Sequence, residues 1–188
     1  MNPAVLSQIA VLTLTNPAEA ARRLLDLRPG REVVWLAFFL AVVLNGAIQI
    51  GIEQMVPVPQ GEPLPVSDPV ILNLLRSSGA MLLSVVALLF VGRTIGGVAT
   101  FKDILILTIW LQFLQIAAMS VTLIVSMVVP FMMVMFLLAT ALVSLYVSMH
   151  FLNEAHKFNS MLKSFGVILL SALISISFVL MFTPSGPV

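Results

Sequence analysis

Two histidines and a glutamate lie within the stretch HFLNEAH, from His150 to His156. Imidazole and carboxylate groups at such close spacing can bind metal ions or transfer protons. On a helix, His150 and Glu154 are four residues apart and share a face, whereas His156 points elsewhere. A metal site would need a third ligand, and the chain has no other histidine. We therefore expect no metal here and interpret the stretch as a turn at the membrane surface.

The stretch GRTIGGVATFKD, from Gly92 to Asp103, could be a phosphate-binding loop, a hinge or a simple turn. It lacks the preceding strand and the glycine spacing of a dinucleotide-binding loop. We interpret it as a cytoplasmic turn in which Gly96 and Gly97 let the backbone bend and Arg93 and Lys102 reach lipid head groups. The sequence also has no nucleophile elbow, metalloprotease helix or Walker motif. We expect neither an enzyme nor a bound cofactor.

The composition is that of a protein surrounded by lipid. Hydrophobic residues make up 60% of the chain, charged residues 9%, and the mean hydropathy is +1.13. Soluble domains carry about 25% charged residues, so this chain could not cover a water-facing surface. The net charge of +1 excludes nucleic acid as an expected partner, and the absence of cysteine excludes disulfides and thiolate metal sites.

Five apolar stretches have the length of membrane spans. A helix needs about 20 apolar residues to cross a hydrocarbon core of about 30 Å. The uncharged stretch 104–153 is too long for one crossing, and Pro130 is the expected break. The predicted fold is an all-α integral membrane protein, with a five-helix transmembrane domain over 33–188. The predicted spans are about 33–55, 70–91, 104–128, 130–152 and 165–182.

Residues 1–32 are expected to form short cytoplasmic interfacial helices. The strings MNPA and TNPA each place asparagine before proline, which is typical of a helix start, and Glu19 follows Asn16 at the capping-box position. The predicted helices are about 3–14 and 17–28. The second is amphipathic, and it either lies on the membrane surface or packs beneath the bundle. Its apolar side carries Ala21, Leu24 and Leu25, and its polar side Glu19, Arg22, Arg23 and Asp26.

The distribution of basic residues predicts the orientation. With a cytoplasmic N-terminus, eight of the nine Lys and Arg residues lie on the inner side, and only Arg76 lies on the outer side. Inner loops of membrane proteins carry such an excess of positive charge. Five spans then place the C-terminus outside.

Three stretches carry a resemblance to a known family. They are NPAEAARRLLDLRPGREVVWLAFFLAVVLNGAI, GGVATFKDILILTIWLQFLQI and LYVSMHFLNEAHKFNSMLKSFGVILLSAL. The chain resembles the bacterial branch of the Yip family, the Ypt-interacting or Yip-one-domain membrane proteins, over nearly its whole length. The resemblance implies five helices with a cytoplasmic N-terminus, and hence a bacterial inner membrane protein with a periplasmic C-terminus. Eukaryotic members are linked to vesicle traffic and small GTPases. Because this chain lacks their long N-terminal region and acidic segment, we do not expect a GTPase partner.

Polar side chains recur along the spans at helical spacing. Thr140, Ser144 and Ser148 form one such stripe. Stripes of this kind either bond helices to one another or line a cavity for a solute, a lipid head group or an ion. Glu53 and Arg76 fall at similar depth, so they either pair or Arg76 extends to the outer surface. The candidate intramembrane site comprises Asn45, Gln49, Glu53, Asn73, Arg76, Gln112, Gln115 and Ser144.

The cytoplasmic face is the second candidate site, since nearly all the charge lies there. The predicted function is to organise or assist other membrane proteins or lipids, with membrane lipids, other membrane proteins or a second copy as partners. The alternative is a small-solute or ion transporter or channel that uses the polar stripes. A simpler interpretation of the basic residues is that they only set the topology. The candidate contact surface comprises Arg22, Arg23, Arg93, Phe101, Lys102, His156 and Lys157.

Overall fold

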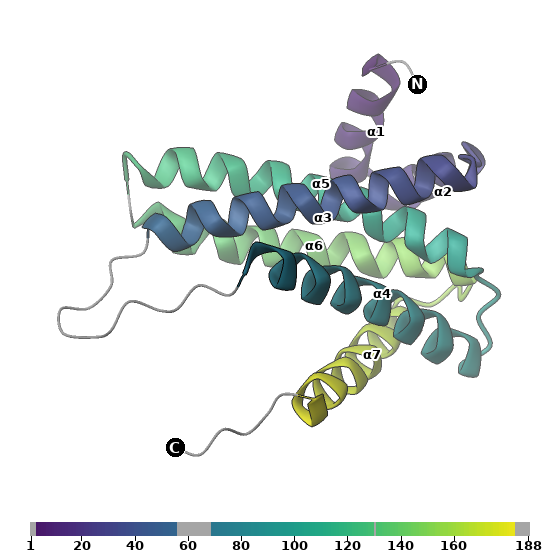
Figure 1. The fold of residues 1–188 in the computed structure, drawn as a ribbon. Coiled ribbons are helices and arrows are strands. Elements are labelled where there is room, and N and C mark those ends of the chain that lie inside the picture. Colours follow the sequence, from purple (N-terminus) through teal and green to yellow (C-terminus); the bar gives the residue numbers. More distant parts are fainter. Residues whose placement is uncertain (1–2, 56–68, 130, 183–188) are drawn as a thin grey trace. The chain divides into compact units, whose positions relative to one another are not determined.

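The computed structural model describes residues 3–55, 69–129 and 131–182, and these residues form seven α-helices (Figure 1). Pro130, the expected break between two spans, and residues 56–68 lie outside the described residues. The predicted N-terminal helices, 3–14 and 17–28, correspond to α1 and α2. The helices are α1 Pro3–Thr15, α2 Pro17–Asp26, α3 Arg31–Met55, α4 Val70–Thr94, α5 Phe101–Ser126, α6 Met132–His156 and α7 Met161–Phe182.

Four of the five predicted spans coincide with helices that are long and apolar enough to cross a membrane. They are Arg31–Gly51 of α3 and the whole of α4, α5 and α6. The fifth predicted span falls on α7, whose described apolar part is the shorter Met161–Ser177. The whole helix has 22 residues and rises about 33 Å, which is enough for a core of about 30 Å. The four long helices are those of a multi-pass membrane protein, and the fifth span stays a prediction.

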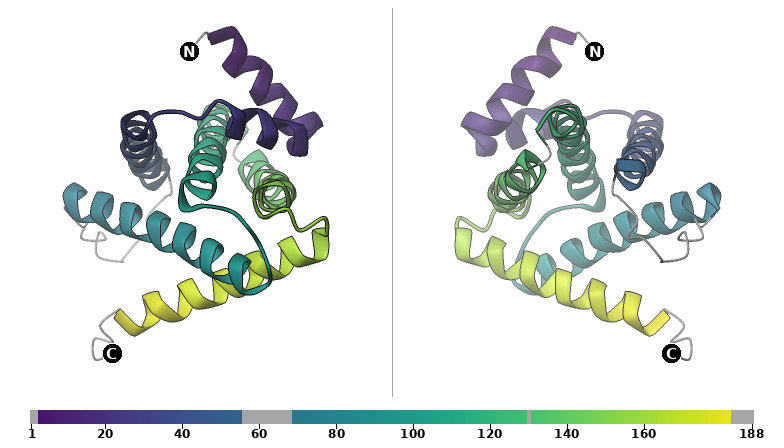
Figure 2. Two further views of the ribbon diagram at one scale, coloured as in Figure 1. Left: turned by 90° about the vertical axis from the view of Figure 1, so that its right-hand side faces the viewer. Right: turned by 90° about the vertical axis from the view of Figure 1, so that its left-hand side faces the viewer.

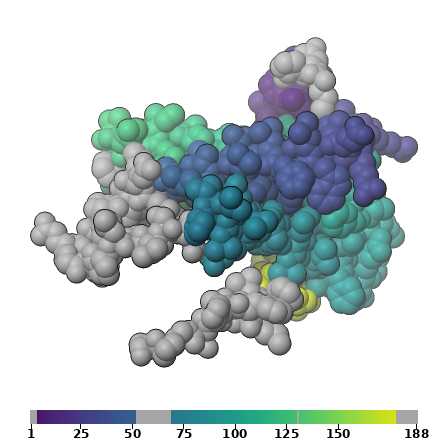
Figure 3. All heavy atoms as spheres, viewed as in Figure 1, coloured from purple at the N-terminus to yellow at the C-terminus, as the bar shows by residue number. Residues whose placement is uncertain are grey.

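The surfaces of these helices are apolar. On α3, Leu36 is 72% exposed and Phe39 is 57% exposed, and Val43 is exposed on the same helix. The blue stretch in Figure 3 is this helix. Large apolar side chains gathered in this way are stable against lipid rather than water. The exposed surface therefore agrees with the composition.

The chain divides into two compact units, each built from separate parts of the sequence. Unit 1 comprises Met1–Arg28, Ala80–Thr108 and Tyr146–Val188. Unit 2 comprises Pro29–Gly79 and Ile109–Leu145. The long helices α4, α5 and α6 each contribute to both units. The predicted division is of another kind, because it separates cytoplasmic helices, 1–32, from a transmembrane domain, 33–188. It stays a prediction.

In unit 1, α1 leads directly into α2 at a sharp angle (Figure 2). Asn16 stands between them, and its Oδ1 accepts a hydrogen bond from the Glu19 N–H at 3.3 Å. This confirms Asn16 as the helix cap. The other half of the predicted capping box is wrong, because the Asn16 N–H donates to the Leu12 carbonyl at 2.7 Å. The carboxylate of Glu19 is thus left for Arg23, at 3.1 Å.

Helices α4 and α6 end in the same way. The Gly97 N–H donates to the Gly92 carbonyl at 2.8 Å, and the Phe158 N–H donates to the Asn153 carbonyl at 3.2 Å. Both bonds belong to the Schellman motif, in which the residue after the helix takes a left-handed conformation. That residue is Gly96, with φ of +95°, after α4 and Lys157, with φ of +55°, after α6. The predicted backbone bend is therefore located at Gly96.

Side chains cap the helices that follow these two turns. The Thr100 hydroxyl and the Asp103 carboxylate form a capping box at the start of α5, where the Thr100 N–H donates to Asp103 Oδ2 at 2.9 Å. At the start of α7, Ser160 Oγ accepts the Lys163 N–H at 3.5 Å. The Ser160 N–H itself donates to Asn153 Oδ1 at 3.0 Å. Both turns of unit 1 are thereby fixed at each end.

Candidate functional site

Unit 1 contains all the segments predicted to form the cytoplasmic contact surface. They are α2, the stretch Gly92–Asp103 with the α4–α5 turn (residues 95–100) and the stretch Asn153–Lys163 with the α6–α7 turn (residues 157–160). A backbone hydrogen bond of 3.2 Å runs from the Val98 N–H to the His156 carbonyl and joins the two turns. We call this joined pair the turn pair. It brings together two stretches of sequence that lie some 60 residues apart.

The imidazole of His156 fills the space inside the turn pair. The residue is only 1% exposed, and its ring stacks on Phe158 with a centroid separation of 4.9 Å. A Cβ added to Gly92 would lie 2.8 Å from His156 Nδ1 and closer still to two other ring atoms. A Cβ added to Gly97 would lie 2.7 Å from Cγ and would collide with Nδ1. Gly92 and Gly97 are therefore required because the ring rests directly on their backbone.

His156 has a packing role, and the prediction that it belongs to the contact surface is wrong. The ring is enclosed by the two glycines and Phe158, so a partner could not touch it. The Leu88 carbonyl lies near the ring, but neither ring nitrogen makes a bond with hydrogen-bond geometry in the described part of the chain. A helix carbonyl at that position already accepts the N–H four residues later. The ring therefore serves as a flat packing group against the backbones of Gly92 and Gly97.

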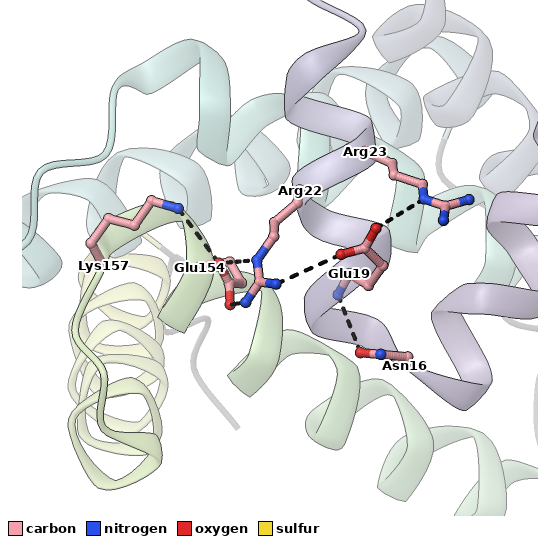
Figure 4. Close-up of polar contacts among 6 residues, drawn as sticks. All are labelled: Asn16, Glu19, Arg22, Arg23, Glu154 and Lys157. Carbon is pink, nitrogen blue, oxygen red and sulfur yellow. Dashed lines mark hydrogen bonds and ion pairs between the residues drawn. The ribbon is translucent and has the colours of Figure 1, made fainter.

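Glu154, two residues before His156, binds α2 instead of a metal. Its carboxylate accepts two hydrogen bonds from Arg22, at 2.7 and 3.0 Å, and lies 3.5 Å from Lys157 Nζ (Figure 4). The hydrogen bond to Glu154 raises the pKa of the Arg22 guanidinium above its ordinary value. His150 packs its ring against Tyr146, 4.6 Å away. Among the described residues no three His, Asp or Glu side chains are placed to hold a metal ion.

Most of the predicted basic side chains of unit 1 are exposed. Those of Arg22, Arg23 and Lys157 are 55%, 54% and 60% exposed. Lys102 is also exposed, and Phe101 is half-buried. Arg93 is exposed as well, and its guanidinium donates to the Ala99 carbonyl at 3.1 and 3.2 Å, which closes its own turn.

Unit 2 holds part of the predicted intramembrane site in a pocket of about 260 Å³ between α3, α5 and α6. Gln115 Nε2 donates to Ser144 Oγ across it at 3.0 Å. Gln49, Asn73 and Arg76 are exposed and do not line it. The side chain of Glu53 is outside the described residues, so its pairing with Arg76 stays a prediction. The pocket is lined by Asn45, Gln112, Gln115, Met119, Leu137, Thr140, Ala141 and Ser144.

Three residues that were not among the predictions have a type or spacing that indicates their role as helix caps. Thr100 and Asp103 have the spacing of a capping box, and Ser160 has the residue type of a helix cap. Gly92 and Phe158 carried no such signal, because their roles depend on contacts between distant segments. The same holds for Met119, Leu137 and Ala141, which resemble any other apolar residue of a span.

The contact between His156 and the glycines predicts a strong coupling between their substitutions. Gly92→Ala should lower the free energy of unfolding in detergent by about 1–3 kcal/mol, because the new methyl group overlaps the ring. In a His156→Ala background the same change should cost less than about 0.5 kcal/mol, since the ring is gone. Gly166→Ala is the control, because nothing lies within 4 Å of a Cβ at that position. An equal cost of Gly92→Ala in both backgrounds would contradict the assignment.

The Arg22–Glu154 bond predicts that α2 is held against α6 by one of its two arginines. The chain has no cysteine, so the thiol introduced by Leu24→Cys, at a position 4% exposed, reports on whether α2 opens. Adding Arg22→Ala should make this thiol react severalfold faster with a maleimide. Adding Arg23→Ala should not, because Arg23 binds Glu19 of its own helix. Both variants remove one charge near the thiol, so equal rates would show that Arg22 does not hold α2.

Comparison with known proteins gives one match. No curated protein and no solved structure is significantly similar to the chain. The family model described as the Yip1 domain matches residues 11–182, which includes α2 and both turns of the turn pair. The match extends over most of the 188 residues. The resemblance seen in the sequence is thus confirmed, and the chain belongs to the Yip1 domain family.

Proposed function

We propose that this Yip1 domain protein organises or assists other membrane proteins or lipids and does not catalyse a reaction. We place it in a bacterial inner membrane with five spans, a cytoplasmic N-terminus and a periplasmic C-terminus. The observation that supports this function best is the fixed, basic surface of unit 1 around the turn pair. Anionic lipid head groups are the partners that its charge fits.

The charge of unit 1 is unbalanced. Its three segments hold seven Lys and Arg residues and four Asp and Glu residues. Three of the acids are engaged locally, because Glu154 binds Arg22, Glu19 binds Arg23 and Asp103 caps α5. Each basic residue near a membrane surface contributes about 1 kcal/mol of attraction to anionic lipid. A surface with this excess can hold several head groups at once.

The rigidity of the surface also supports a binding role. Positive side chains anchored on a fixed backbone lose less conformational freedom on binding than those of a flexible segment. The three side chains that could do acid–base chemistry have other contacts here, because His156 is buried, Glu154 is bonded to Arg22 and His150 packs against Tyr146. A transporter would need a polar path along the length of the spans. The pocket of unit 2 is a local site lined by eight residues of α3, α5 and α6.

The test removes charge without touching the turn pair. Lys102 and Lys163 are exposed, and no contact of their side chains is part of the turn pair. Lys102→Gln with Lys163→Gln should lower the amount of anionic lipid that co-purifies by about fivefold per charge, as expected from about 1 kcal/mol each. Lys102→Arg with Lys163→Arg is the matched control and should retain the lipid.

The measurement is mass spectrometry of lipids and proteins bound to the full chain after purification from native membrane. Correct insertion of each variant is checked first. If the glutamine and arginine variants retain the same lipids and proteins, the basic residues serve only to set topology, and the proposal is rejected.

The proposed topology predicts the activity of a reporter that works only outside the cytoplasm. It should be active when fused after Val188 or inserted near Gly61, and inactive near Gly97 or Asn159, because basic residues stay inside. The fusion after Val188 also counts the spans, since α7 must cross the membrane for the C-terminus to lie outside. Activity near Gly97 would reverse the orientation, and inactivity after Val188 would leave four spans.

A further inference from the structure

The pocket of unit 2 lies near the middle of three long helices. Asn45 is the fifteenth of the 25 residues of α3, and Gln112 is the twelfth of the 26 residues of α5. Thr140 and Ser144 are the ninth and thirteenth of the 25 residues of α6. In helices that cross a membrane, these positions are far from the water on either side. The polar groups of the pocket are therefore placed where polar groups are costly.

The lining has hydrogen-bonding capacity that its own side chains do not use. Gln115 donates to Ser144. The half-buried side chains of Asn45, Gln112 and Thr140 make no hydrogen bond with the rest of the described chain. Elsewhere in the same unit, the hydroxyls of Ser120 and Thr122 bond the carbonyl four residues earlier, as expected in an apolar span. The Thr140 hydroxyl does not, so it is available to a ligand.

The chemistry of the lining selects the kind of ligand. Amides and hydroxyls both donate and accept hydrogen bonds, and the lining contains no charged side chain. An ion or a phosphate in this position would lose its hydration without gaining an opposite charge. The 260 Å³ of the pocket correspond to the volume of about eight or nine water molecules, which is more than a small polyol unit needs. Met119 and Leu137 provide apolar surface for its carbon atoms.

We propose that this pocket binds an uncharged glycerol-type group through its free hydroxyls. Asn45, Gln112 and Thr140 supply the hydrogen bonds, one from each helix of the pocket. The group comes either from free glycerol or from a neutral lipid with a free glycerol hydroxyl, such as diacylglycerol. The site belongs to unit 2 and does not depend on the basic surface of unit 1.

The experiment measures the unfolding midpoint of the full chain in a glycerol-free detergent. The first probe is glycerol at millimolar concentration, and the second is dioleoylglycerol in phosphatidylcholine nanodiscs. At least one probe should raise the midpoint of the wild-type chain in a saturable way. A response to glycerol identifies the free polyol as sufficient, and a response to dioleoylglycerol alone identifies the lipid. If neither probe gives a saturable rise, the proposal is overturned.

Variants show whether the response comes from this pocket. Gln112→Leu removes an amide of the lining and should weaken the response at least tenfold, equivalent to about 1.4 kcal/mol. Ala141→Leu fills the pocket, keeps every polar group and should abolish the response if Gln112→Leu does not fold. Gln49→Leu is the control, because it makes the same change on α3 outside the pocket. Wild-type responses from both pocket variants would overturn the proposal.

Discussion

The imidazole of His156 lies directly on the backbone of Gly92 and Gly97, and the rest of unit 1 depends on this contact. It is possible only because both positions lack a Cβ, and it is held by the stacking of Phe158 on the ring. The carbonyl of His156 then accepts the Val98 N–H. One residue thus joins the end of α6, the end of α4 and the α4–α5 turn through its side chain and its backbone together.

The position of Glu154 follows from that of His156. Since both lie in the last turn of α6, fixing the histidine also fixes the carboxylate that receives Arg22 of α2. The Schellman motifs at Gly96 and Lys157 turn the chain sharply after each helix, so the two turns meet instead of diverging. The exposed basic side chains therefore stand on a base that is fixed by packing. This is the physical reason to assign the binding role to this face.

The sequence was sufficient for the parts of the fold that depend on local pattern. Apolar runs placed the four long spans, and the NPA strings placed α1 and α2. Charge placed Arg22 and Arg23 on the exposed side of α2, and helical spacing selected Asn45, Gln112, Gln115 and Ser144, which meet at one pocket. Such features repeat every few residues and can be recognised without knowing what lies opposite them.

Features that depend on contacts between distant segments could not be predicted. His156 has the residue type of a surface or metal-binding group. It is buried only because its ring packs on the backbones of Gly92 and Gly97, which lie far away in the sequence. The polar stripes give no sign that Gln49 and Asn73 stay outside the pocket, because the rotation of one helix against the next is set by packing.

The central claim is that His156 holds the two turns together, and hydrogen exchange at the Val98 amide tests it most directly. This amide lies outside any helix, and its only partner in the described chain is the His156 carbonyl. In the full chain in detergent, the account predicts that it exchanges as slowly as the amides of the adjacent helices, since it opens only when the turns separate. Exchange at the rate of an open loop would contradict the account.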